Sequence, residues 1–473
     1  MKIKKSILLS LLSVFISTSV FSKNTEIDGK WQGSIKISSV NLKIIVEIDT
    51  DAKEKKYTIQ IPQQLKEKLE LSEFQKENKN IKFQLKTPNG TAFFDGEIDK
   101  DNILGKFSQN GGNGIFEISR NFKEEEKKVN PNYNEEEVSF KNNDVTLAGT
   151  FSTPKKGSNF PVVILITGSG PQNRDEEIFG IKPFELMANF FNRKGFAVLR
   201  FDDRGVGEST FGKNSDPTTL DLSTDTEAAI KYLKTRKDIN KNKIGLFGHS
   251  EGGMIVNMIA SKNPDVSFGI MMAGTSITGE RILLEQAELI ARADGIDEKI
   301  ITKNRELSQK IYDIQKKGIN KENEFKKVKD LIKEAILSDD KNIPKNLKNT
   351  PNELNDYVEK VADSIILSVN SKWTEFFISY DPKNDIEKVK VPVLAIFGSK
   401  DLQVPSESNK KSLEEIIKKT GQKNYEMVVI KNANHLFQEA KTGSPSEYGT
   451  LSKEFIPDFL KQIEIWLDKN IIL

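Results

Sequence analysis

Short runs of alternating apolar and polar residues dominate the chain between residues 27 and 122. The clearest are V-N-L-K-I-I-V-E-I-D, K-Y-T-I-Q-I, I-K-F-Q-L, T-A-F-F-D-G-E-I and G-I-F-E-I-S, with Gly, Asn and Asp turns between them. A period of two is typical of β-strands that bury one face. We therefore expect an antiparallel sheet closed into a small barrel or sandwich, with Trp31 in its core rather than on a ligand platform.

A different pattern begins at about residue 137, where apolar strands alternate with helices. Near-continuous apolar runs such as P-V-V-I-L-I and F-A-V-L-R-F are separated by helical segments around 183–194 and 222–235. Strands that are buried on both faces have this composition. The alternation predicts an α/β unit built on a mostly parallel sheet with right-handed crossovers.

Residues 279–385 interrupt this alternation with charged helical stretches and no clear strand. The strand pattern resumes at V-P-V-L-A-I-F-G and Y-E-M-V-V-I, and a last helix is expected from about Lys453. A helical insertion within a continuing sheet is most simply a cap over the carboxyl edge of that sheet.

Residues 123–136 are charged, contain a proline and lack periodicity, which is typical of a linker. The whole chain then divides into six segments. In order, they are a signal peptide at 1–22, a β accessory domain at 23–122, the linker at 123–136, the first part of an α/β core at 137–278, a helical cap at 279–385 and the second part of the core at 386–473.

The N-terminus has the features of a secretory signal. A basic start, M-K-I-K-K, precedes an uncharged stretch from Ser6 to Ser22, and the residues at Val20 and Ser22 suit cleavage after Ser22. An uncleaved anchor is the alternative, although the stretch is short for a bilayer. No Cys follows it to carry a lipid. We expect an exported protein, periplasmic or extracellular, with no membrane span after cleavage.

Two features of the composition narrow the chemistry. The chain has no Cys, which excludes thiol nucleophiles, disulfides and iron–sulfur clusters, and it has only two His, His249 and His435. The 71 basic and 69 acidic residues nearly balance, so charge gives no reason to expect a nucleic-acid partner or binding to an anionic membrane. No dinucleotide or phosphate-loop motif occurs, and we expect neither a cofactor nor a metal.

The sharpest motif is G-H-S-E-G-G at residues 248–253, between the strand K-I-G-L-F and a helix that begins at Glu251. In such a turn the serine adopts a strained backbone, and side chains in place of Gly248 and Gly252 would collide with neighbouring segments. The turn exposes the Ser250 hydroxyl at the carboxyl edge of the sheet. The sequence therefore predicts Ser250 as a nucleophile.

A serine nucleophile needs a base, and the base needs a carboxylate that orients it. His249 adjoins Ser250, so its side chain points away from the serine side chain, and we interpret it as a packing or orienting residue. His435, in N-A-N-H, remains as the base. Asp401, in F-G-S-K-D, is the preferred acid because it directly follows a predicted strand. The rival acids, which follow no strand, are Asp381 and Asp385.

The oxyanion of a tetrahedral intermediate needs hydrogen-bond donors. We expect one from the backbone N–H of Glu251, directly after the nucleophile. The second is expected from the loop T-G-S-G-P that follows the strand P-V-V-I-L-I, at Ser169 or one position to either side. The segment D-D-R-G at 202–205 follows the next strand, and we interpret its Asp and Arg side chains as an internal ion pair that fixes a loop. Binding of an anionic substrate is the alternative.

In the expected cap, four aromatic residues share one helix face at spacings i, i+3, i+4 and i+7. They form either the core of the cap or an apolar wall over the acyl or alcohol pocket of a substrate site. Only the second arrangement would bring them into contact with a substrate. These residues are Trp373, Phe376, Phe377 and Tyr380.

The motifs resemble those of the α/β-hydrolase family, and within it the bacterial carboxylesterases of the EstD type. The similarity rests on T-G-S-G-P-Q-N-R-D, R-F-D-D-R-G-V-G-E-S, G-H-S-E-G-G, F-G-S-K-D-L-Q-V-P and N-A-N-H, over about residues 136–473. It implies a helical cap after the sixth core strand, a Ser–His–Asp acyl-enzyme mechanism and short acyl esters as substrates. The β region resembles the accessory domain of some exported bacterial hydrolases. One departure is T-G-S-G where lipases often carry H-G-G.

Three classes of function remain open at this point. The first is an exported serine hydrolase that cleaves small-molecule carboxylic esters. Related families with the same triad include aminopeptidases and thioesterases, so an amide or a thioester is an alternative scissile bond. A binding protein with a vestigial hydrolase domain is the third class, and the complete triad argues against it.

We predict that the mature protein begins at Lys23, because the signal is cut after Ser22. N-terminal sequencing of protein recovered from outside the cytoplasm should read K-N-T-E-I-D. Retention of Met1 in that protein would contradict cleavage and favour the uncleaved anchor.

Overall fold

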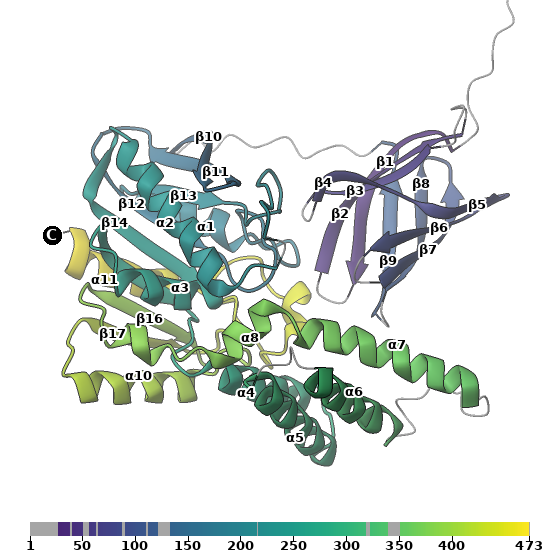
Figure 1. Cartoon of the computed structure of the whole chain (residues 1–473). Helices are drawn as coiled ribbons and strands as arrows, with labels where there is room; N and C mark the ends of the chain where they lie inside the picture. Colours follow the sequence, from purple (N-terminus) through teal and green to yellow (C-terminus); the bar gives the residue numbers. More distant parts are fainter. Residues whose placement is uncertain are drawn as a thin grey trace, which may run out of the picture.

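The computed structural model describes residues 27–37, 40–50, 56–62, 65–87, 90–109, 112–121, 133–214, 216–317, 322–338 and 351–472. The expected signal peptide and residues 123–132 of the expected linker lie outside these ranges. The described residues form an N-terminal β unit and a larger α/β unit from which a group of helices extends (Figure 1).

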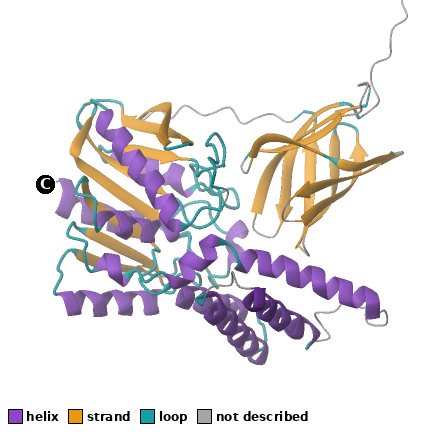
Figure 2. Cartoon of the chain, in the orientation of Figure 1, coloured by secondary structure: helices purple, strands orange, loops and turns teal. Residues whose placement is uncertain are grey.

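The N-terminal unit is an antiparallel sheet of nine strands that curls into a nearly closed barrel (Figure 2). The strands lie in the order β4-β3-β2-β1-β9-β8-β7-β6-β5, so the first and last strands in sequence are neighbours. Their bounds are β1 Gly29–Ile37, β2 Val40–Asp49, β3 Lys56–Ile61, β4 Leu65–Glu70, β5 Ser72–Glu77, β6 Asn80–Thr87, β7 Gly90–Asp99, β8 Asn102–Gln109 and β9 Gly112–Ser119.

Inward-facing side chains of these strands form a separate hydrophobic core. Trp31 is fully buried there, and its indole N–H donates to the carbonyl of Ile27 at 2.9 Å. The rings of Phe83, Phe94 and Phe116 lie 4.5 to 5.8 Å apart between centroids. The predicted antiparallel β unit is confirmed, and Trp31 belongs to its core.

The second sheet is mixed, with the order β10-β11-β13-β12-β14-β15-β16-β17. β10 and β11 form an antiparallel hairpin at one edge, and β11 also pairs antiparallel with β13. The remaining neighbours are parallel. The bounds are β10 Tyr133–Asn142, β11 Val145–Pro154, β12 Phe160–Ile166, β13 Ala197–Phe201, β14 Ile239–His249, β15 Val266–Met272, β16 Val393–Gly398 and β17 Tyr425–Ile430. Residues 133–136, assigned to the linker from sequence, belong to β10 because they pair with β11.

Helices cover both faces of this sheet. Phe268 of β15 packs near Trp466 with ring centroids 6.2 Å apart, whereas a Cβ on the next residue, Gly269, would lie 2.7 Å from the side chain of Val256. Adjacent strand residues point to opposite faces, so the helices that carry Trp466 and Val256 lie on opposite sides. The helices of this unit are α1 Pro183–Arg193, α2 Thr219–Thr235, α3 Glu251–Ala260, α10 Ser406–Thr420 and α11 Pro457–Leu467.

The predicted helical insertion is confirmed between β15 and β16. Its described helices are α4 Gly279–Ala293, α5 Glu298–Gln315, α6 Glu322–Leu337, α7 Pro351–Val369, α8 Lys372–Ser379 and α9 Lys383–Ile386. The insertion has a small hydrophobic core of its own, which includes Ile311, Val328, Ile332 and Val358. By contrast, Phe377 of α8 belongs to the core of the α/β unit, so α8 joins the cap to the sheet.

The parallel strands direct their carboxyl ends to one edge of the sheet. Segments after β12, β14, β16 and β17 therefore meet there, beneath the insertion that follows β15. Among the helices that the structure describes, none has both the length and the apolar character that a membrane crossing requires.

Candidate active site

Ser250 lies in a sharp turn between β14, which ends at His249, and α3, which begins at Glu251. Its backbone has φ 53° and ψ −115°, a conformation that costs free energy for any residue with a side chain. The backbone N–H of Ser250 donates to the carbonyl of Met272 at 2.9 Å, which ties the turn to the end of β15. The structure thus places Ser250 in the strained strand-to-helix turn that its motif predicts.

Close backbone contacts explain the glycines around this turn. A Cβ on Gly248 would lie 2.0 Å from the carbonyl oxygen of Gly252. A Cβ on Gly252 would lie 2.2 Å from the carbonyl oxygen of Ile166, at the end of β12. Real Cβ atoms do not approach backbone oxygens this closely, so neither position accepts a side chain without movement of the backbone.

His435 and Asp401 form a buried pair at the same edge of the sheet. His435 Nδ1 lies 2.8 Å from Asp401 Oδ2, and the other carboxyl oxygen accepts the N–H groups of Gln403 and Val404, each at 2.8 Å. Three donors hold the carboxylate in place, so Nδ1 carries a proton and Nε2 is left as the basic nitrogen.

The rival carboxylates have other partners. Asp385 accepts the hydroxyl of Tyr380 at 2.6 Å and that of Ser261 at 3.1 Å. Asp381 accepts the backbone N–H of Lys383 at 3.0 Å. In the part of the chain that the structure describes, neither aspartate is bonded to a histidine.

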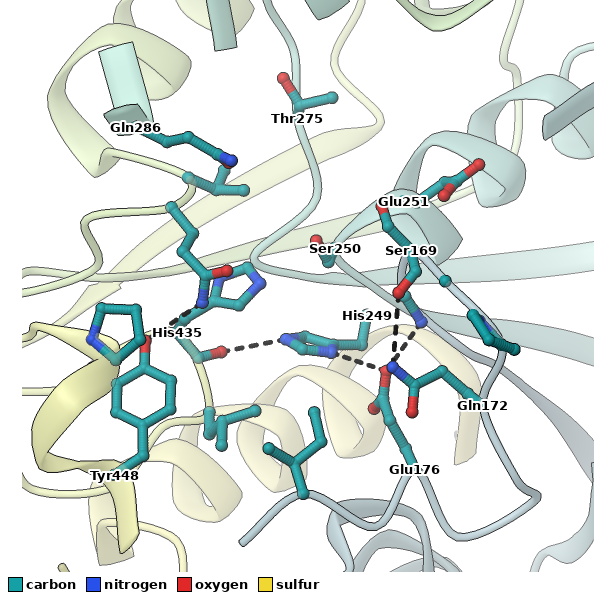
Figure 3. Close-up of a pocket in the computed structure, with 18 of the residues that line it drawn as sticks. Ser169, Gln172, Glu176, His249, Ser250, Glu251, Thr275, Gln286, His435 and Tyr448 are labelled. Carbon is teal, nitrogen blue, oxygen red and sulfur yellow. Dashed lines mark hydrogen bonds and ion pairs between the residues drawn. The ribbon is translucent and has the colours of Figure 1, made fainter. Parts of the chain in front are cut away.

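Ser250 and His435 line one pocket of about 510 Å³ (Figure 3). No hydrogen bond joins the side chains of Ser250 and His435 in the described structure, whereas Asp401 is bonded to the imidazole of His435. Hydrogen bonds between a nucleophile and its base are often long without substrate and tighten when substrate binds. The structure therefore brings the three predicted residues to one site with the acid–base pair already formed.

The loop after β12 lies directly against the nucleophile. A Cβ on Gly168 would be 3.2 Å from Cβ of Ser250. The backbone N–H of Gly168 is occupied, because it donates to Glu176 Oε1 at 2.7 Å. This occupied donor leaves Ser169, which lines the pocket beside Glu251, as the better candidate for the second oxyanion donor.

Internal bonds hold the segment D-D-R-G, as its ion-pair interpretation expects. Arg204 makes two bonds of 2.8 Å to the carboxylate of Asp225. Asp203 accepts the hydroxyl of Thr167 at 2.7 Å and the backbone N–H of Gln172 at 2.9 Å. Burial raises the pKa of Asp203 well above its usual value despite these donors. These contacts fix both ends of the oxyanion loop.

Glu176 is a site residue that sequence reasoning missed. It lies in the charged run P-Q-N-R-D-E-E, which has no periodicity and no recognisable spacing to the triad. Its Oε1 lies 2.9 Å from His249 Nδ1, and His249 Nε2 lies 3.0 Å from the backbone carbonyl of His435 (Figure 3). The His249 ring therefore contacts both the loop after β12 and the backbone of His435.

The four cap aromatics divide into two stacked pairs. Trp373 and Phe377 stack at 4.7 Å and line the pocket. Phe376 and Tyr380 stack at 5.6 Å and do not line it. The reason is local, since α8 ends at Ser379 and Tyr380 turns its hydroxyl toward Asp385. Only the first pair occupies the position expected of an apolar wall.

Trp373 also connects the cap to the nucleophile turn. Its indole N–H donates to Glu251 Oε1 at 2.9 Å, and the side chain of Ser169 also interacts with this carboxyl. Glu251 Oε2 is buried without a hydrogen-bond partner in the described structure. Burial raises the pKa of Glu251, partly offset by its donors.

Other pocket residues belong to no motif. Leu42 of β2, Gln286 of α4 and Tyr448, in a short 3₁₀ helix at Pro445–Thr450, all line the cavity. Their positions depend on tertiary packing, so no local pattern identifies them. Within the described residues, no group of three or more His, Asp or Glu side chains is arranged to hold a metal ion.

We predict that Gly252→Ala strongly lowers the thermal unfolding midpoint, because its Cβ would meet the backbone at the end of β12. The matched control is Gly295→Ala, whose Cβ would meet no atom within 4 Å and whose φ of 78° costs about 1–2 kcal/mol for a residue with a side chain. Equal shifts for the two variants, measured by calorimetry, would show that close approach at residue 252 is no constraint.

We predict that Trp373→Phe lowers the free energy of unfolding by about 1–3 kcal/mol at neutral pH, because a buried carboxyl oxygen loses its donor. Since the pKa of Glu251 is raised in the folded state, protonation at lower pH stabilises that state. The loss should therefore shrink as the pH falls. Denaturant unfolding of the wild-type protein and the variant over a pH series measures this loss in the free energy of unfolding. The same substitution in a Glu251→Gln background should lose its pH dependence, and a pH-independent loss in the wild-type background would contradict the prediction.

Comparisons with known proteins identify the family of this chain. The model of the alpha/beta hydrolase fold family matches residues 161–442. The chain is 28% identical over 342 residues to Esterase EstD of Thermotoga maritima, which covers 70% of this chain and 69% of the relative. An uncharacterized 31.7 kDa protein of Escherichia coli is 24% identical to this chain, and the match covers 56% of this chain and 80% of that protein. The solved structure of a Pyrococcus furiosus esterase aligns with this chain at 16% sequence identity and a TM-score of 0.42, and the alignment covers 72% of this chain and 92% of the esterase chain. Because the family model covers more than half of its length, this chain belongs to the α/β-hydrolase family.

Proposed function

We propose that this hydrolase is an exported serine esterase that cleaves carboxylic esters of small molecules. The observation that carries the proposal is the buried Asp401–His435 pair, which lines the same pocket as a serine held in a strained turn. The similarity to Esterase EstD supports an ester as the scissile bond. Export rests on the N-terminal segment alone.

The first half of the reaction forms an acyl-enzyme. Ser250 Oγ attacks the ester carbonyl carbon while His435 Nε2 takes the hydroxyl proton, and Asp401 stabilises the resulting imidazolium. The backbone N–H groups of Glu251 and Ser169 receive the negative charge on the carbonyl oxygen. When the intermediate collapses, the bond to the alcohol oxygen breaks and His435 returns the proton to that oxygen.

The second half repeats the chemistry with water. His435 takes a proton from water as its oxygen attacks the acyl carbon, and the new intermediate expels Ser250 Oγ, which regains the proton. The acid product leaves as a carboxylate at neutral pH. Each group returns to its starting state, so the cycle needs no cofactor.

The pocket walls favour an ester with an apolar part. Beside the polar triad, the cavity is lined by Ile282 and Leu283 of α4, Trp373 and Phe377 of α8, and Leu436 next to the base. Such a lining buries an acyl chain or an alcohol group, and the few polar groups then fix the carbonyl. The cap supplies four of these five residues, so it shapes the substrate-binding part of the pocket.

We predict that Ser250→Ala reduces kcat for a p-nitrophenyl ester by a factor of at least about 10³, because the nucleophile is removed. The fold should stay intact, with an unchanged circular dichroism spectrum. The control is Ser408→Ala, whose hydroxyl lies on α10 and bonds the carbonyl of Pro405 at 3.4 Å. Wild-type turnover in the Ser250 variant would refute the assignment.

The same assay separates the candidate scissile bonds. Wild-type protein should hydrolyse p-nitrophenyl esters faster than matched aminoacyl-nitroanilides and acyl thioesters, and a fluorophosphonate probe should label it at Ser250. Faster cleavage of the amides would contradict the assignment as an esterase and favour a serine peptidase. Failure of the probe to label the protein would favour a binding protein with a vestigial hydrolase domain.

A further inference from the structure

His249 lies between two hydrogen-bond acceptors beside the pocket (Figure 3). Nδ1 is 2.9 Å from Glu176 Oε1, and Nε2 is 3.0 Å from the backbone carbonyl oxygen of His435. A neutral imidazole has one N–H and one lone pair, so it can donate to only one of them. An imidazolium donates to both. When Glu176 is ionised, only the doubly protonated ring donates in both contacts.

Glu176 supplies the opposite charge. Its Oε1 also accepts the backbone N–H of Gly168 at 2.7 Å, so this oxygen already serves as a hydrogen-bond acceptor. Glu176 and His249 are both at most 2% exposed, and a buried ion has to be paired. Oε2 of Glu176 has no hydrogen-bond partner in the described structure. The imidazolium is thus the main counter-charge of this carboxylate.

We propose that His249 is a positioning residue, a doubly protonated imidazolium that Glu176 holds and that fixes the backbone of His435 beside the nucleophile. The inference rests on the proposed function, in which His435 is the base. His435 is then anchored twice, at its backbone carbonyl by His249 and at Nδ1 by Asp401. These two bonds together determine where the basic Nε2 points, as supporting contacts around catalytic groups generally do.

Several ionisable groups surround the His249 ring. Glu176 faces Nδ1 from the loop after β12, and the ring of His435 lies 4.5 Å away between centroids. Asp401 acts from the loop after β16, and Glu251 begins α3. Burial lowers the pKa of His249, but the carboxylate of Glu176, the backbone carbonyl of His435 and the more distant carboxylate of Asp401 together outweigh burial, and the pKa is raised.

The sign of the pH effect follows from this rise. The proton on His249 stabilises the folded state fully below the unfolded-state pKa of about 6.5. That stabilisation is lost as the pH rises through the higher pKa of the folded state. His249 therefore keeps its proton to a higher pH than an unperturbed imidazole would.

Because the chain has only two histidines, nuclear magnetic resonance can observe both rings directly. In full-length protein labelled with ¹⁵N-histidine, His249 should show two protonated ring nitrogens at neutral pH. A His435→Gln variant assigns the signals. This measurement uses no substrate, so it stands even if the esterase assignment fails. A His249 ring with a single protonated nitrogen at neutral pH would overturn the proposal.

Glu176→Gln tests the consequence for the reaction, because the amide keeps the shape and an acceptor oxygen but loses the charge. His249 should become neutral and lose one of its two bonds, and kcat for a p-nitrophenyl ester should fall about 10- to 100-fold with KM changed less than about two-fold. The control is Glu185→Gln, on the exposed face of α1, which should retain wild-type kcat. An unchanged His249 spectrum, or an unchanged kcat, in the Glu176 variant would refute the positioning role.

Discussion

The close approach of the β14–α3 turn to its neighbours is the constraint on which the site depends. Ser250 occupies a φ of 53°, and the turn persists because the surrounding backbone leaves no space for a relaxed alternative. Gly252 lies against the end of β12, and Gly253 lies against Gly274 after β15. These contacts hold the nucleophile, the oxyanion loop and the segment that leads into the cap in one rigid frame. The backbone of the turn therefore places the serine side chain at the pocket.

The amino-acid sequence predicted most of the fold, and several of its omissions have a physical cause. The core strands were identified because burial on both faces requires continuous apolar runs. Among the barrel strands, β1, β4, β5 and β8 were not identified as separate runs. Of these, β4, L-K-E-K-L-E, and β5, S-E-F-Q-K-E, occupy the two ends of the strand order and carry few apolar residues. At such positions, pairing with a neighbouring strand decides the conformation rather than local propensity. The last helix begins at Pro457 instead of Lys453. Proline is favoured in the first turn of a helix, so the helix starts at the proline.

The candidate site likewise contains residues that the sequence could predict and residues that it could not. Ser250, Asp401 and His435 each follow a recognisable strand, so their meeting at one sheet edge could be predicted from strand ends alone. Glu176 could not, because it reaches His249 only through the tertiary fold of a loop in which its own φ is 51°. The cap aromatics show the limit of periodicity. Their spacing predicted one helix face, and α8 carries Trp373, Phe376 and Phe377 but ends before Tyr380. The spacing also could not predict that the rings form two separate pairs.

Glu251 links the chemistry to the cap through two different groups. Its backbone N–H faces the proposed oxyanion position, while its side chain accepts the indole N–H of Trp373 from α8. A buried carboxyl with one unpartnered oxygen is costly, so the protein retains it at the expense of stability. Movement of α8 away from the sheet would break this bond and expose the carboxyl to water, where its ionised form is favoured. The Trp373 indole is one of several side-chain donors to Glu251, and it is the one that α8 of the cap supplies, so this hydrogen bond connects the cap to the residue after the nucleophile.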